Sequence, residues 1–212
     1  MSDREAPALF PAFLKLAGRK CLVVGAGQAG EPKIQGLLAT GAALAVVAPH
    51  ATEAVQAWAS AGKLKWQARK FEPSDLEGVF LAVVATSLPA LNRRVFEQAR
   101  LEGVLCNVVD DPTHCDFYYP AVVRRGALQI AISTDGKSPA LAQRLRKELE
   151  QSFGADYERW IEQLGRARQQ LFRQPMDPQE RTRVLHELAS REGFEEFVRE
   201  QTESGCLLSF PP

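Results

Sequence analysis

A glycine-rich turn directly after an apolar run is the feature that most constrains the fold. Residues 21–33 read CLVVGAGQAGEPK, in which Gly25, Gly27 and Gly30 form the pattern GxGxxG. Between a strand and a helix, these glycines allow a tight turn, close approach of the backbone to a pyrophosphate, and close packing of the helix on the strand. Amides at the helix N-terminus then face the phosphate charge. A purely structural turn is the alternative. We predict a dinucleotide site that includes Gly25, Ala26, Gly27, Gln28 and Ala29.

Two residues near this turn qualify the prediction. Pro32 falls in the first turn of the expected helix, where a missing amide hydrogen breaks no intrahelical bond, so we expect the helix to tolerate it. An acidic residue commonly ends the second strand and binds the adenosine ribose, but here the sequence reads Ala48-Pro49-His50. Ribose recognition is therefore expected from backbone groups or from His50, unless His50 is a solvated turn residue.

Apolar runs and helical patterns alternate as far as residue 113. Strands are expected at 21–27, 44–49, 63–68, 79–86 and 104–111, and helices at 31–40 and 89–102. Pro49 is expected to end the second strand. This alternation predicts an α/β fold with a Rossmann-type, doubly wound parallel sheet.

After Pro112 the pattern changes. Two strands outside the alternation are expected within 114–126 and 128–134, followed by a helix from Ser138. Further helices are expected over 157–171 and from Asp177, with Asp177, Pro178 and Glu180 as N-cap, N1 and N3. We predict a nucleotide-binding domain at 1–113, a small β-plus-helix segment at 114–150 and an all-helical C-terminal domain at 151–212.

Composition excludes several classes of function. The 26 basic and 26 acidic residues cancel, so no net field attracts the chain to nucleic acid or to an anionic membrane. No apolar run approaches the roughly 20 residues of a membrane span, and the N-terminus lacks the apolar core of a signal peptide. The four cysteines form no CxxC pair, which is typical of reduced thiols in a cytoplasmic protein.

The run NVVDDP over residues 107–112 ends an expected parallel strand. Ligands bind in the crevice beyond the carboxyl ends of such strands, so Asp110 is expected to face the same cleft as the glycine turn. An ordinary Asp-Asp-Pro turn explains the run equally well. The adjacent His114, Cys115 and Asp116 should point to alternating faces, so we expect no metal site there. His114 could act as an accessory proton carrier.

Three segments resemble one known family. CLVVGAGQAGEPK, CNVVDDPTHCDFYYPAVVRRGALQIAIST and DGKSPALAQRLRKELE are similar to the precorrin-2 dehydrogenase / sirohydrochlorin ferrochelatase family, found as the first module of siroheme synthases and as a stand-alone protein. The resemblance covers roughly residues 8–172. It implies NAD as cofactor, dimerisation through 114–150 and hence a homodimer. It also implies oxidation of precorrin-2 to sirohydrochlorin, with Fe²⁺ insertion by the same cleft in some members.

The resemblance assigns roles to individual residues. Asp110 matches the functional aspartate of the family, which we expect to accept a proton during both reactions. Gln28 and Ala29, together with Pro49 and His50, match its NAD contacts. Pro32 departs from the family, in which an arginine or similar residue precedes the lysine, and this should lower cofactor affinity. We also assign Thr86, the last residue of the apolar run 79–86, to the cofactor site.

The implied substrate is rich in carboxylates, so its site should offer cations and a helix N-terminus. Ser133 and Thr134 match a pair of hydroxyl residues of the family, the second of which is phosphorylated in one type of member. Basic residues are frequent nearby, although solvated helix-face charges would look the same. The predicted substrate-binding residues are Asn107, Arg124, Ser133, Thr134, Lys137 and Ser138.

Two other functions stay open from the sequence. A dimeric module that senses NAD(H) without catalysis would need the same glycine turn but not Asp110. A tetrapyrrole carrier would bind sirohydrochlorin without producing NADH from precorrin-2.

Overall fold

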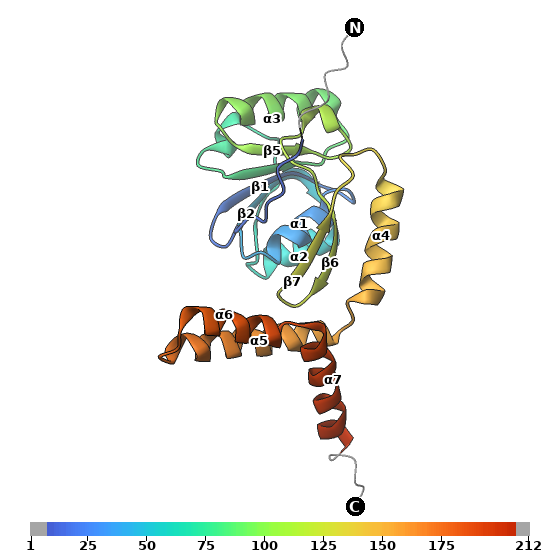
Figure 1. Cartoon of the computed structure of the whole chain (residues 1–212). Coiled ribbons are helices and arrows are strands. Elements are labelled where there is room, and N and C mark those ends of the chain that lie inside the picture. Colours follow the sequence, from blue (N-terminus) through green and yellow to red (C-terminus); the bar gives the residue numbers. More distant parts are fainter. Residues whose placement is uncertain (1–7, 207–212) are drawn as a thin grey trace, which may run out of the picture. The chain divides into compact units, whose positions relative to one another are not determined.

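The computed structural model describes residues 8–206 and the side chains of residues 8–203. The chain divides into two compact units, the first ending at Tyr119 and the second beginning at Pro120 (Figure 1). The first unit corresponds to the predicted nucleotide-binding domain, extended past residue 113 by the segment that follows the last parallel strand. The division of the remainder into 114–150 and 151–212 stays a prediction.

The first unit contains a five-stranded parallel sheet with strand order β3-β2-β1-β4-β5. The strands are β1 (Lys20–Ala26), β2 (Ala43–Ala51), β3 (Lys65–Gln67), β4 (Leu81–Val84) and β5 (Leu105–Val108). Because the order reverses direction at β1, β2 and β3 lie on one side of it and β4 and β5 on the other. This is the predicted Rossmann-type sheet, and its switch point is where such folds bind ligands.

The predicted end of the second strand is wrong, and the fourth and fifth strands are shorter than predicted. The sequence suggested that Pro49 ends the second strand, but β2 continues through Pro49 to Ala51. Ala51 pairs with Ala26 beyond a shift in register between Val24 and Ala26. The irregular pairing accommodates a residue that has no amide hydrogen to donate to a ladder. The extension carries Pro49 and His50 alongside the glycine turn.

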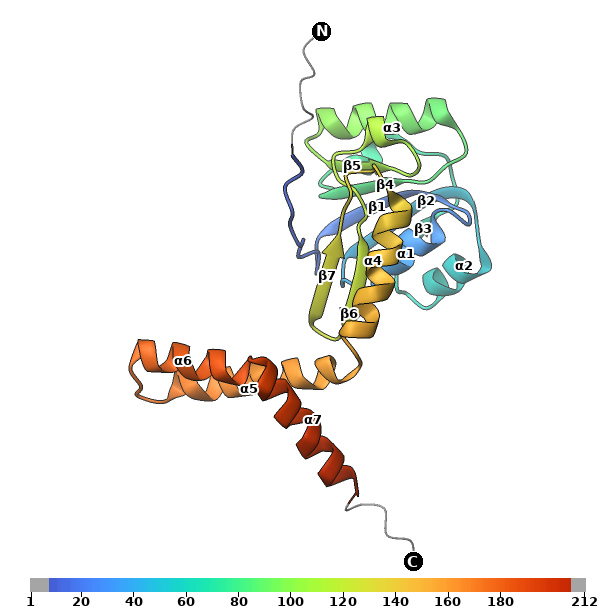
Figure 2. The same ribbon diagram turned by 45° about the vertical axis from the view of Figure 1, so that its right-hand side comes forward.

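Helices cover both faces of the sheet (Figure 2). The helices α1 (Glu31–Leu38) and α2 (Glu53–Ser60) pack Ile34, Leu37 and Val55 on one face. The helix α3 (Pro89–Leu101) and the short 3-10 helix η1 (Pro73–Leu76) cover the other face, while a second 3-10 helix, η2 (Pro112–His114), follows β5. Burial of both faces explains why the central strands are apolar throughout rather than alternating.

The second unit begins with an antiparallel hairpin of β6 (Ala121–Arg125) and β7 (Leu128–Ile132), on which α4 (Pro139–Ser152) packs. The Arg125 guanidinium donates to the carbonyls of Glu150 and Phe153 at 2.9 and 2.7 Å, which ties the hairpin to the end of α4. Both predicted strands and the predicted helix are therefore present.

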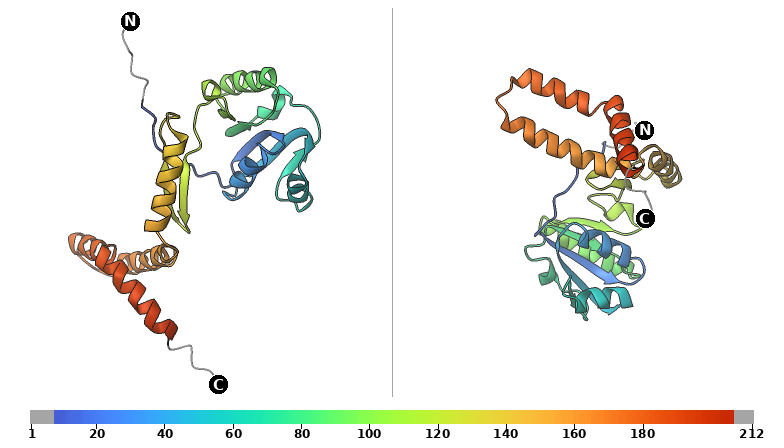
Figure 3. Two further views of the ribbon diagram at one scale, coloured as in Figure 1. Left: turned by 90° about the vertical axis from the view of Figure 1, so that its right-hand side faces the viewer. Right: turned by 90° about the horizontal axis from the view of Figure 1, so that it is seen from below.

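Three further helices follow, α5 (Asp156–Arg173), α6 (Pro178–Leu188) and α7 (Arg191–Cys206). In Figure 3, α5 and α6 run side by side as an antiparallel pair. Aromatic rings join α5 to α7. The Tyr157 and Phe194 rings stack with centroids 4.3 Å apart. Asp177 accepts hydrogen bonds from the N–H groups of Gln179 and Glu180, as predicted for the N-cap of α6.

No helix between residues 8 and 206 is both long enough and apolar enough to cross a membrane. The thiols of Cys21, Cys106 and Cys115 form no disulfide within the described residues, and the side chain of Cys206 lies outside them. The reduced state of the cysteines stays a prediction.

Candidate dinucleotide-binding site

A pocket of about 760 Å³ lies at the carboxyl ends of the parallel strands. Its size is typical of small-molecule and cofactor sites. All eight predicted cofactor residues line the pocket, and Asp110 lines it too. These nine lining residues are Gly25, Ala26, Gly27, Gln28, Ala29, Pro49, His50, Thr86 and Asp110.

The three glycines of the turn have different structural roles. Gly25 has φ +101°, and a Cβ there would lie 2.4 Å from the Ala85 carbonyl oxygen. A Cβ at Gly30 would lie 2.4 Å from the Gly25 carbonyl oxygen, so this glycine lets α1 approach the turn. A Cβ at Gly27 would have no described atom within 4 Å. The open side at Gly27 leaves room for a pyrophosphate close to the backbone.

Backbone amides of the turn are available to an anion. The N–H groups of Gly30 and Glu31 both donate to the Gly27 carbonyl at 3.0 Å, which starts α1. Within residues 8–206, no acceptor is recorded for the N–H groups of Gln28 and Ala29, which lie between β1 and α1. Pro32 lies in the first turn of α1, as predicted, without interrupting the helix. The turn therefore fits the phosphates of a dinucleotide.

Thr86 is fixed at the turn after β4. Its hydroxyl donates to Asn92 Oδ1 at 2.5 Å and accepts from the Leu88 N–H at 3.1 Å. The Asn92 amide in turn donates to the Thr86 carbonyl at 3.1 Å. This network holds the start of α3 against the end of β4, on the pocket wall opposite β2. A direct contact of Thr86 with the cofactor stays a prediction.

Asp110 has an unusual backbone. Its φ is +62°, and among the described residues Asp135 is the only other non-glycine residue with a positive φ. The left-handed conformation costs an L-residue about 1–2 kcal/mol, and such conformations concentrate at functional sites. Asp110 is exposed at the pocket. Two features therefore position the Asp110 carboxylate at the pocket: its left-handed backbone and its location directly after β5.

Lys33 of α1 is a cation near Asp110 that the sequence analysis missed. Burial lowers the pKa of Lys33, and the Asp110 carboxylate opposes this by raising it. Lys33 Nζ also lies 3.9 Å from the centroid of the Tyr119 ring. The signal in the sequence is a lysine in the first turn of the helix that follows the glycine turn. A lysine in this position places positive charge beside the carboxylate that we expect to act in the chemistry.

Asn107 does not line the pocket. It is buried, and its amide donates to the Phe117 carbonyl at 2.7 Å and to Cys115 Sγ at 3.2 Å. The side chain therefore anchors the segment that follows β5. Its predicted contact with substrate stays a prediction.

His114, Cys115 and Asp116 have separate partners, in agreement with the alternation that the sequence suggested. His114 Nδ1 lies 2.7 Å from Asp111 Oδ2, and Asp116 accepts from the Cys106 N–H at 2.9 Å. The Cys115 thiol lies 3.2 Å from the Val108 carbonyl. No group of three or more His, Cys, Asp and Glu side chains within the described part of the chain is arranged to hold a metal ion.

Four of the predicted substrate residues share one turn of the second unit. Thr134 Oγ1 accepts from the Ser138 N–H at 3.1 Å, and Ser133 Oγ accepts from the Asp135 N–H at 3.2 Å. Ser138 is the N-cap of α4. Lys137 lies between them and is exposed, and Arg124 is exposed on β6. Their contacts with substrate stay predictions.

Two cations of the pocket were also missed. Lys70 follows β3, and Arg94 projects from α3, and both line the pocket. Each lies far in sequence from the glycine turn, so only the crossovers of the fold bring them to it. The occurrence of basic residues after the third strand was the one available signal.

A parallel sheet with a glycine turn at its switch point, an open Gly27 and unengaged amides defines an NAD(P)-binding Rossmann protein. Comparisons with known proteins agree. Residues 12–121 match a family model described as putative NAD(P)-binding, and residues 125–152 match one described as the central part of sirohaem biosynthesis proteins. The predicted NAD cofactor is thereby confirmed.

The relatives narrow this class to one family. The chain is 42% identical over 140 residues to a siroheme synthase of Photorhabdus laumondii and 43% identical over 155 residues to one of Cronobacter sakazakii. These matches cover 66% and 73% of this chain but only 30% and 33% of the relatives. A solved structure of SirC, a precorrin-2 dehydrogenase, is 30% identical with a TM-score of 0.75, covering 92% of this chain and 100% of that one. The chain belongs to the precorrin-2 dehydrogenase / sirohydrochlorin ferrochelatase family.

Proposed function

We propose that this chain catalyses the NAD-dependent dehydrogenation of precorrin-2 to sirohydrochlorin in siroheme biosynthesis. The observation that carries the proposal is the position of Asp110. This carboxylate has a strained backbone and lies on the pocket formed by the dinucleotide turn. A proton acceptor beside a hydride acceptor is the arrangement that a dehydrogenation requires.

The strand order suggests which residues would face each half of the cofactor. The amides of Gln28 and Ala29 would bind the pyrophosphate, and the ends of β2 and β3 would face the adenosine half. The nicotinamide half would then lie toward β4 and β5, near Thr86 and Asp110. When bound, NAD⁺ supplies the acceptor for the hydride.

Loss of a hydride and a proton completes the oxidation. The Asp110 carboxylate would take the proton that leaves the macrocycle, and bound NAD⁺ would supply the acceptor for the hydride, which carries both electrons of the C–H bond. Lys33 places positive charge near this carboxylate.

We also infer a homodimer and a carboxylate-binding role for the turn 133–138. The match of residues 125–152 to the central segment of sirohaem biosynthesis proteins supports a role for this segment in the same family activity. Lys137 and Arg124 are exposed cations that could bind substrate carboxylates.

Asp110→Asn tests the proposal. Asparagine tolerates the left-handed backbone at least as well as aspartate, so the turn should keep its geometry while losing the base. We expect NAD⁺ affinity within about twofold of wild type and precorrin-2 turnover reduced about 10²–10⁴-fold. Glu97→Gln, which removes an exposed carboxylate of α3 that does not line the pocket, is the control. Unchanged turnover in Asp110→Asn would refute the role of Asp110 and favour a sensor of NAD(H).

Insertion of Fe²⁺ into sirohydrochlorin is the second activity of the family, and for this chain we propose it as a separate step. Entry of Fe²⁺ releases two pyrrole protons, which a carboxylate near the tetrapyrrole could accept. The test is anaerobic metallation of sirohydrochlorin by Fe²⁺ with and without the protein. Equal rates in the two samples would exclude this step.

A further inference from the structure

The pocket has an uneven distribution of charge. Among the described residues that line it, Asp110 is the only carboxylate, and it lies at the end of β5. On the opposite side, His50 belongs to β2 and Lys70 follows β3. Because β2 and β3 face the adenosine half of a dinucleotide in this fold, His50 and Lys70 lie at the adenosine end, whereas Arg94, the third basic residue of the described lining, belongs to α3, which packs on β4 and β5.

The end of β2 has no group that would repel a phosphate. NAD-specific sites of this fold use an Asp or Glu there to bind the 2′-hydroxyl of the adenosine ribose. The same carboxylate would repel a 2′-phosphate. Here Pro49 and His50 are exposed at that position.

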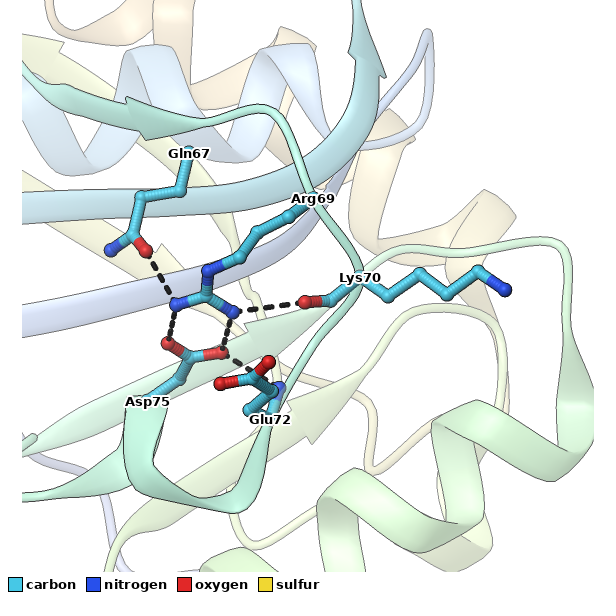
Figure 4. A network of polar contacts seen from close by, with 5 residues as sticks. All are labelled: Gln67, Arg69, Lys70, Glu72 and Asp75. Carbon is cyan, nitrogen blue, oxygen red and sulfur yellow. Dashed lines mark hydrogen bonds and ion pairs between the residues drawn. The ribbon is translucent and has the colours of Figure 1, made fainter.

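A rigid network positions Lys70 (Figure 4). The Arg69 guanidinium donates to both carboxylate oxygens of Asp75, at 2.9 and 2.5 Å, and its Nη1 also donates to the Lys70 carbonyl at 2.9 Å. The Glu72 N–H donates to Asp75 at 2.8 Å. These bonds fix the backbone of the loop after β3 at the Lys70 carbonyl and at the Glu72 N–H.

The network leaves the ammonium of Lys70 unused. Figure 4 shows its side chain extending away from the Arg69–Asp75 pair. Arg69 is neutralised by Asp75, whereas no carboxylate of the described chain forms an ion pair with Lys70. Lys70 is therefore an available cation on a fixed backbone at the adenosine end of the pocket. Cations in this position are what a 2′-phosphate requires.

We propose that this pocket also accepts a dinucleotide phosphorylated at the 2′ position of the adenosine ribose, with Lys70 and His50 as the residues that bind the phosphate. NADP⁺ would therefore bind as well as NAD⁺. The inference rests on the proposed function only in taking this pocket as the cofactor site, because it concerns binding and not turnover.

Calorimetric titration without precorrin-2 tests the proposal. The probes are NAD⁺, NADP⁺, adenosine 5′-monophosphate and adenosine 2′,5′-bisphosphate. We expect wild-type protein to bind NADP⁺ within about tenfold of NAD⁺ and to bind the bisphosphate more tightly than the monophosphate. Lys70→Met should weaken NADP⁺ about tenfold, as for loss of one charge-assisted phosphate contact, and leave NAD⁺ within about twofold.

Two further variants make the result decisive. Lys65→Met removes an exposed lysine of β3 that does not line the pocket and should change neither affinity. His50→Asp introduces a carboxylate at the end of β2 and should favour NAD⁺ over NADP⁺ by about tenfold relative to wild type. NADP⁺ binding more than a hundredfold weaker than NAD⁺ in wild type, or an equal loss of both in Lys70→Met, would overturn the proposal. Neither result depends on whether precorrin-2 is oxidised.

Discussion

Gly27→Ala separates the binding role of the glycine turn from its structural role. A methyl group at Gly27 meets no described atom within 4 Å, and the backbone there is not left-handed. The folded protein can therefore accept alanine. The same methyl group would project into the space that we assign to the pyrophosphate.

The structure sets the expected magnitudes. Alanine at a compatible backbone position changes the free energy of unfolding by about 0.4–1 kcal/mol, in the stabilising direction. Displacing the pyrophosphate from the turn loses at least one hydrogen bond to a charged group, about 1.5–3 kcal/mol. At 1.4 kcal/mol per factor of ten, NAD⁺ affinity should fall about tenfold to a hundredfold.

Gly30→Ala is the matched comparison. Its methyl group would lie 2.4 Å from the Gly25 carbonyl, so backbone must move and the protein should lose stability. Thermal unfolding and calorimetric titration with NAD⁺ on both variants separate the two effects. If Gly27→Ala unfolds like wild type and binds NAD⁺ with unchanged affinity, no phosphate approaches this turn and the assigned site is wrong.

Two more predictions concern stability. Burial alone would raise the pKa of Asp75, but hydrogen bonds from Arg69 and the Glu72 N–H outweigh it and lower that pKa. The lowered pKa contributes stability above the unfolded-state pKa of about 4, and this stability is lost as the pH falls through the folded-state pKa. The free energy of unfolding should therefore fall less steeply with decreasing pH in Asp75→Asn than in wild type. An exposed control, Glu97→Gln, should behave like wild type. Asp177→Ala should lower the free energy of unfolding of the helical region by about 1 kcal/mol in urea titrations followed by circular dichroism, whereas Asp177→Asn should leave it nearly unchanged. Equal losses in the two Asp177 variants would mean that the cap does not stabilise α6.

The fold was predictable where local pattern and tertiary structure agree. The buried strands are apolar runs, and the glycine spacing over Gly25–Gly30 directly after such a run is typical of a strand–turn–helix unit. Pro49 shows the limit, because pairing of Ala51 with Ala26 carries β2 past a residue that normally ends a strand. Its consequence is functional, since the longer strand places His50 on the pocket.

The pocket residues that follow the strand ends could be predicted from the sequence, whereas the basic side chains of the pocket could not. Each predicted cofactor residue adjoins a strand end, and strand ends meet at one edge of a parallel sheet. Lys70 and Arg94 reach the pocket from a loop and a helix whose paths depend on packing across the sheet, which no local pattern reports. Asn107 belongs to the same motif as Asp110, but its amide turns inward and donates to the Phe117 carbonyl, a contact that the motif alone did not indicate.

Anaerobic incubation with precorrin-2 and NAD⁺ tests the proposed function most directly. The absorbance of NADH and the spectrum of the tetrapyrrole would be followed together. We predict that NADH appears in a one-to-one ratio with sirohydrochlorin and that neither forms when NAD⁺ is omitted. Protein that binds NAD⁺ and yet leaves precorrin-2 unoxidised, with no NADH formed, would contradict the proposed dehydrogenase.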